Sequence, residues 1–149
     1  MIVDEGCLFG VPLGGGKYGV GLAARIGDRG MTLGYFSGQL FDGLPSTAEA
    51  SFLPHSAIWI ALFGDLEIMN GRWPVLGKVA GWDREVWPLP DFGRTADLSG
   101  RHFRVSYMGD IKSRPMEIPS SMDDIAGLPE AGTAGAGFVE NRLRRLLGV

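Results

Sequence analysis

The chain has 149 residues, a length that suits one domain able to bury about 70% of its unfolded surface without disulfides or metals. Its net charge of -3 and pI of about 5.3 exclude the broad positive field that holds a nucleic-acid backbone. Its single cysteine, Cys7, excludes an internal disulfide, and residues 57–64, its longest strongly apolar segment, are too short to cross a bilayer.

The first candidate motif is the glycine fingerprint of nucleotide-binding loops, which the stretch VPLGGGKYGVGLAARIG carries at Gly14, Gly16 and Gly19. That motif requires a helix after the glycines, because the helix N-terminus holds the phosphate. Here apolar residues recur at every second position instead, which indicates a strand. Tyr18 also stands where a Walker loop needs Ser or Thr. The glycines therefore predict a hairpin between strands at residues 7–13 and 18–26.

Further strands follow along the chain. Residues 31–36 alternate and predict a third antiparallel strand, while residues 37–51 have the composition of a loop. The apolar run at 57–64 predicts a central strand covered on both faces. Its core candidates are Ile58, Trp59, Ile60, Leu62 and Phe63.

The next segments are shorter and contain several prolines. Asn70 and Gly71 mark a turn, and residues 75–79 read as a short strand. The stretch WDREVW, residues 82–87, predicts another strand followed by an ordered loop. Residues 102–107 alternate and predict the last strand of the sheet.

The end of the chain differs in character from the rest. A short helical turn capped by Ser120 or Ser121 precedes a Gly/Ala-rich loop at residues 127–137. Residues 138–147 predict one helix, which Gly148 caps. Its predicted buried face consists of Phe138, Val139, Leu143, Leu146 and Leu147.

Together these elements predict one α+β domain over residues 1–149. A mostly antiparallel twisted sheet or partly open barrel occupies residues 5–108, and a loop and the C-terminal helix, packed on the sheet, occupy 109–149. The start MIVDEGCLF has neither a basic segment nor a long apolar run, so we expect no signal peptide or lipoprotein leader. A cytoplasmic protein with no nucleic-acid or membrane partner is the expectation.

Two groups of residues are weighed as catalytic. Cys7 with His55 or His102 would make a thiol nucleophile, although nothing in their spacing brings them together. Asp83 and Glu85 would share one face of a strand, as a paired acid and base. A small hydrolase is the alternative function on these residues. The spacing of histidines and cysteine favours no metal site, and the sequence offers no cofactor site.

Four segments resemble the immunity protein 26 family of bacterial polymorphic toxin systems: EGCLFGVPLGGGKYGVGLAARIG, GYF, NGRWPVLGKV and WPLPDFG. Arg72 and Trp73, with the glycine hairpin, carry most of the likeness. The resemblance implies a small α+β protein, cytoplasmic and not an enzyme, that binds and neutralises a cognate toxin. It implies no particular contact residues.

Acidic and aromatic groups on expected loops supply a candidate toxin-binding face, since such groups attract and anchor a basic partner. The predicted partner-binding residues are Asp65, Glu67, Trp82, Asp83, Glu85, Trp87 and Asp91. A third hypothesis is a small barrel that binds a nucleotide or nucleic acid, which the negative net charge disfavours. The sequence leaves the oligomeric state open.

Overall fold

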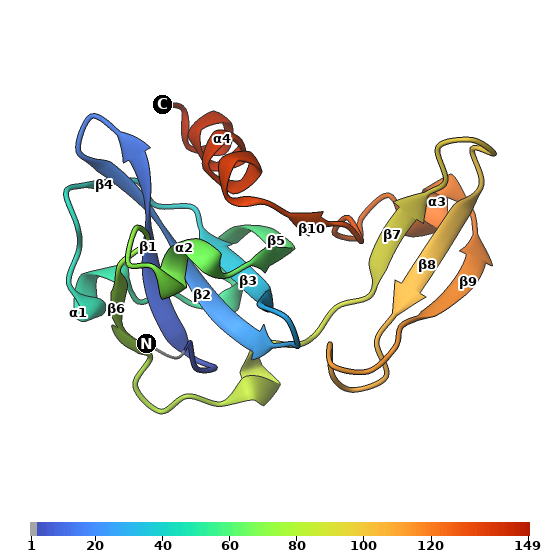
Figure 1. Ribbon diagram of the computed structural model, residues 1–149, viewed down its shortest axis with the longest axis horizontal. Coiled ribbons are helices and arrows are strands. Elements are labelled where there is room, and N and C mark those ends of the chain that lie inside the picture. The colour runs from blue at the N-terminus through green and yellow to red at the C-terminus, as the bar shows by residue number, and fades with distance from the viewer. Residues whose placement is uncertain (1–2) are drawn as a thin grey trace.

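The computed structural model describes residues 3–149, and within that range two sheets lie side by side (Figure 1). The larger consists of β1 (Cys7–Gly14), β2 (Lys17–Ile26), β3 (Met31–Ser37), β4 (Phe41–Asp42), β5 (Ala57–Gly64), β6 (Val75–Lys78) and β10 (Thr133–Ala134). Its order is β10-β5-β3-β2-β1-β6, with β4 paired to β2, and only β10 with β5 is a parallel pair. The smaller consists of β7 (Phe92–Thr95), β8 (His102–Ser106) and β9 (Met116–Ser120).

Short helices and turns connect the strands. They are α1 (Thr47–Ala50), α2 (Leu66–Met69), α3 (Met122–Ile125), α4 (Ala136–Leu147) and two 3-10 turns, η1 (Pro54–Ser56) and η2 (Arg84–Val86). The predicted α+β class, with a C-terminal helix on a mostly antiparallel sheet, is confirmed. The sheet is not closed into a barrel.

The glycine motif forms the predicted hairpin. Gly15 and Gly16 have φ angles of 61° and 76°, as a two-residue turn of this kind requires. The chain continues directly into β2, so no helix N-terminus faces the glycines. Strands β1, β2 and β3 therefore form the predicted meander.

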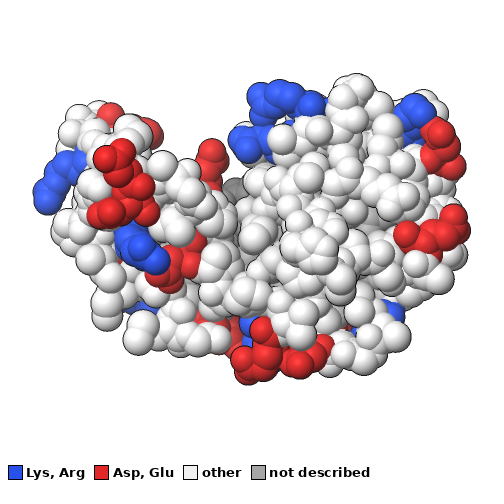
Figure 2. Space-filling model, turned by 180° about the vertical axis from the view of Figure 1, so that it is seen from behind, with Lys and Arg blue, Asp and Glu red and all other residues white. Residues whose placement is uncertain are grey.

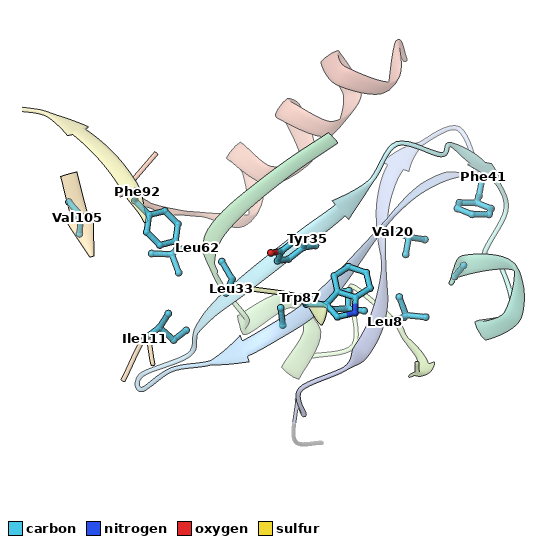
Figure 3. Close-up of a cluster of buried hydrophobic side chains, with 13 residues drawn as sticks. Leu8, Val20, Leu33, Tyr35, Phe41, Leu62, Trp87, Phe92, Val105 and Ile111 are labelled. Carbon is cyan, nitrogen blue, oxygen red and sulfur yellow. The ribbon is translucent and has the colours of Figure 1, made fainter. Parts of the chain in front are cut away.

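The large sheet is buried on both faces. On its helix face, α2 and α4 cover a cluster whose members include Phe9, Phe36, Phe63, Trp73 and Leu143. On its turn face, α1, the segment around η2 and the small sheet cover a second cluster, which includes Leu8, Leu33, Tyr35, Trp87 and Phe92 (Figure 3). Residues of β1 and β3 alternate between the two clusters, as strand geometry requires.

Gly21 makes the helix-face packing possible. A Cβ atom at this position of β2 would overlap the Phe9 ring and come within 2.9 Å of Cε1 of Phe36. The Phe9 ring in turn stacks on Trp73, with centroids 6.0 Å apart and planes 4° apart. The absence of a side chain at Gly21 therefore lets the aromatic cluster close against the sheet.

The exposure of several apolar residues differs from the prediction. Strand β5 is next to the sheet edge rather than central, and its Ile58 is 40% exposed. On α4, Phe138 is 49% exposed and Leu146 is exposed too, because the helix face that packs on the sheet runs through Val139, Leu143 and Leu147 instead. Predicting these side chains as core was wrong. The predicted cap is confirmed, since Gly148 has a φ of 77°.

Several element assignments were also wrong, and the segment expected as a loop after β3 contains β4 and α1. The strand predicted at 82–87 is the turn η2, because the side chain of Asp83 caps it and two prolines follow. Strands β7 and β9 were not predicted, the first because it lies in the expected ordered loop, the second because its side chains are largely exposed. The part from residue 109 onward, predicted as a loop and a helix, thus contributes β9 and β10 to the two sheets.

The assignment of residues 1–149 to one domain stays a prediction. The N-terminal segment, for which no signal peptide or lipoprotein leader was expected, includes residues 1–2, which lie outside the described range. Across residues 3–149, no helix combines the length and apolar character needed to span a bilayer.

Replacing Gly21 by alanine should destabilise the protein by about 1–3 kcal/mol, because the new methyl group overlaps Phe9 and Phe36. Gly137→Ala is the matched control: a Cβ atom added to this exposed helical glycine would meet no other group within 4 Å, and alanine should stabilise α4 by about 0.5–1 kcal/mol. Urea denaturation measures both. Equal stability of the two variants would contradict the packing described.

Candidate partner-binding surface

The turn η2 is an exposed acidic projection on the turn face of the sheet. Asp83 Oδ1 accepts a hydrogen bond of 3.0 Å from the backbone N–H of Glu85, which caps the turn. Both carboxylates lie at the surface. They do not share a strand face, so the expected pairing of an acid and a base on one strand was wrong.

A buried arginine fixes η2 to the sheet. Arg25 lies in β2 and is only 6% exposed. Its guanidinium donates to the carbonyl of Ala24 at 2.6 Å and to the carbonyl of Arg84, inside η2, at 3.1 Å. Burial and the neighbouring Arg84 guanidinium lower the pKa of Arg25. The sheet thus holds the main chain of the turn directly.

Ion pairs surround the same turn. Arg84 Nε lies 3.1 Å from Glu5 Oε1, and Arg84 Nη2 lies 3.9 Å from Asp110 Oδ2. In Figure 2, acidic side chains gather at the lower edge of the molecule, where Figure 1 draws η2 in yellow-green. We use the name η2 surface for Glu5, Trp82, Asp83, Arg84, Glu85 and Asp110.

The two tryptophans beside η2 differ in role. Trp87 is 3% exposed and packs edge-to-face against Tyr35 at a centroid distance of 5.1 Å (Figure 3). It packs in the same way against Phe52, at 5.3 Å. The Tyr35 hydroxyl donates to the carbonyl of Pro88, which holds the chain after η2 in place. Trp82 lies over Gly6 and is partly exposed. Trp87 therefore supports the surface from below, and Trp82 is the ring that a partner can reach.

The other predicted carboxylates have internal partners or lie elsewhere. Glu67 binds Arg72, and Asp91 Oδ2 accepts from Arg104 Nε at 2.7 Å, which lowers the pKa of Asp91. Asp65 precedes α2, where partial burial raises its pKa. Asp65 and Glu67 lie on the helix face of the sheet, opposite η2. The structure brings together Trp82, Asp83 and Glu85 of the seven predicted residues.

A polar cluster attaches α4 to the helix face. Glu140 on α4 is 8% exposed, and its Oε2 accepts 2.9 Å from Trp73 Nε1 and also binds the Arg72 guanidinium. Arg72 binds Glu67 with its Nε, and this hydrogen bond raises the pKa of Arg72. One buried carboxylate thereby satisfies two donors from the loop after α2.

The candidate nucleophile and histidines occupy separate elements. Cys7 is in β1, His55 in η1, and His102 in β8, where its Nδ1 lies 2.8 Å from Thr95 Oγ1. Burial raises the pKa of the Cys7 thiol, which disfavours the reactive thiolate. Within residues 3–149, no three His, Cys, Asp or Glu side chains converge as metal ligands would.

Comparison with known proteins identifies the family. A sequence model described as Immunity protein 26 matches residues 4–104. The chain belongs to the immunity protein 26 family. Neither the curated proteins nor the solved structures contain a match. The matched residues include η2 and Arg25, whereas β9, α3, β10 and α4 lie outside the match. The resemblance inferred from the glycine hairpin and the Arg-Trp pair is confirmed.

Several charged residues of these clusters were not predicted, among them Arg25, Arg84 and Glu140. Arg25 had a detectable signal, because it is a charged residue in a strand whose preceding positions, from Gly19 to Ala24, are glycine or apolar and buried. A charge in that position requires an internal partner. Glu140 had a weaker signal, since it adjoins the buried Val139 in a short amphipathic helix.

Replacing Glu140 by alanine should destabilise the protein by about 1–3 kcal/mol, chiefly because the buried Trp73 N–H loses its acceptor. Glu130→Ala, which removes a mostly exposed carboxylate 3.9 Å from Arg142, should change stability by less than about 0.5 kcal/mol. Urea denaturation distinguishes the two variants. Unchanged stability of the Glu140 variant would show that the cluster does not anchor α4.

The Asp91–Arg104 pair predicts a pH-dependent contribution to stability. Because the folded state depresses the pKa of Asp91, its stabilisation is present above the unfolded-state pKa, about 3.9, and is lost as pH falls through the folded value. The stability difference between wild type and Asp91→Asn should therefore be present at neutral pH and disappear in acid. A difference independent of pH would contradict this.

Proposed function

We propose that this protein neutralises a cognate toxin by binding it, without catalysis, and that the η2 surface forms part of the contact. Family membership supports an immunity role. The observation that carries the contact site is the rigid mounting of η2: buried Arg25 binds its main chain, and Trp87 packs beneath it. A preorganised surface loses little conformational entropy on binding.

The chemistry of the η2 surface favours a basic partner. Asp83 and Glu85 are exposed, and Glu5 and Asp110 surround the one guanidinium of Arg84. Acidic groups at the rim of an interface speed the capture of a positively charged protein. Trp82 is a suitable aromatic anchor, in an interface of about 800 Å² per partner.

Of the predicted partner-binding residues, the proposed contact site includes Trp82, Asp83 and Glu85. Glu67 and Asp91 are held in internal ion pairs, and Trp87 acts through the packing of η2. The proposed location is the cytoplasm of a bacterium that meets the toxin, made by the same cell or by a neighbour, as the family resemblance implies.

Co-expression with candidate toxin domains encoded beside its gene tests the proposal. Wild type should restore growth and form a stable complex. The double variant Asp83→Asn, Glu85→Lys keeps a polar capping side chain but reverses the local charge. It should bind about tenfold more weakly or worse, with reduced protection. The binding constant and the growth rate are the measurements.

The matched control is Asp97→Lys, which changes an exposed carboxylate between β7 and β8, outside the η2 surface. It should bind and protect as wild type does. If the η2 double variant also retained full affinity and protection, the η2 surface would not be the contact site.

A further inference from the structure

A groove follows the outer edge of β5, between the two sheets. One hollow of about 230 Å³ is lined by Trp59, Ile60, Ala61, residues 130 and 132–135, and Phe138. A second, of about 300 Å³, lies between residues 57–60 and 126–129. The two share Trp59 and Ile60, so they form one continuous groove, which we call the β5 groove. In Figure 2 the outline of the molecule is notched between its two halves.

The backbone of β5 has an open edge in this groove. One edge of β5 pairs with β3 along its length, whereas the other pairs only with β10, at Leu62 and Phe63. Over residues 57–60, no strand among residues 3–149 pairs with this second edge. Alternate residues of a strand direct their N–H and C=O groups to each side. Unpaired donors and acceptors therefore line the groove.

The sequence of this edge lacks the usual protection. Proteins normally shield an open edge with a charge, a proline or a bulge, because such an edge can pair with another chain. Residues 57–60 read AIWI and contain neither a charge nor a proline. Ile58 and Phe138, which the prediction placed in the core, are exposed beside it. The Arg142 guanidinium lies 5.4 Å from the Trp59 ring centre and 5.0 Å from that of Phe138.

The groove suits a single extended chain. β10 already pairs with the same edge, immediately beyond the open residues. A second copy of the protein would bring a folded sheet, whose next strand, about 4.8 Å farther out, would meet residues 126–129 on the opposite wall. An extended peptide adds one strand only, and alternate side chains can contact the walls on either side.

We propose that the β5 groove receives an extended segment of the toxin, which pairs with residues 57–60 as an added strand; this rests on the proposed function. The segment carries apolar side chains at alternate positions. These side chains contact one wall formed by Trp59 and Phe138 and another formed by Leu128. It also carries a basic residue for Glu130, whose exposed carboxylate borders the groove and lies 3.9 Å from Arg142.

A library of random linear peptides, selected on the full-length protein, tests this without knowledge of the toxin. Selected peptides should slow amide hydrogen exchange at residues 57–60 by roughly tenfold. Ile58→Lys and Phe138→Lys should each weaken peptide binding by about tenfold or more. Met116→Lys, at a comparably exposed apolar position on β9, is the control and should bind as wild type does. Thermal unfolding verifies that each variant is folded.

Four results would overturn the proposal. They are the absence of any selected peptide, protection of another surface by the selected peptides, wild-type affinity of both groove variants, and a dimer of the protein alone in which residues 57–60 are already protected. In the co-expression assay, full protection by Ile58→Lys would also refute the β5 groove while leaving the proposed function standing. Conversely, peptides bound at residues 57–60 by a protein that neutralises no candidate toxin would support the strand-accepting edge and refute the proposed function.

Discussion

Burial of both faces of the β1–β2–β3 meander is the constraint on which the rest of the structure depends. A sheet that is apolar on both sides needs a covering layer on each. On the helix face that layer is fixed by an aromatic stack, which closes over Gly21, and by the carboxylate of Glu140. On the turn face it is fixed by Trp87 and by Arg25. The turn-face layer presents the η2 surface, and Phe138 of α4, in the helix-face layer, lines part of the β5 groove.

The meander and the C-terminal helix could be predicted because their patterns are local. The alternation from Tyr18 to Ile26 predicted the strand β2, and paired glycines specify the hairpin. The stretch WDREVW also alternates, yet it forms η2. Asp83 offers a local cap, and the following chain is held by Tyr35, which is distant in sequence. The sequence of WDREVW alone therefore does not indicate the contact with Tyr35.

The candidate site was predictable only in part, for a related reason. Residue type identified Trp82, Asp83 and Glu85 as groups suited to an interface. Whether each side chain is exposed, however, depends on residues that are distant in sequence and close in the fold. Trp87 and Trp82 have similar sequence surroundings, yet Trp87 is buried against Tyr35 and Trp82 is partly exposed. Ile58 and Phe138 were predicted to be buried because they are apolar, yet both are exposed beside the open edge of β5. Apolar character predicts burial only where a covering element exists.

Stoichiometric titration of the purified toxin with this protein tests the central claim most directly, namely that it acts by covering a toxin rather than by chemistry of its own. The account predicts that toxin activity falls in proportion to added protein, reaches its minimum near one equivalent, and returns when the complex is dissociated. Suppression of toxin activity by a small fraction of an equivalent, increasing with time and persisting after separation, would contradict it.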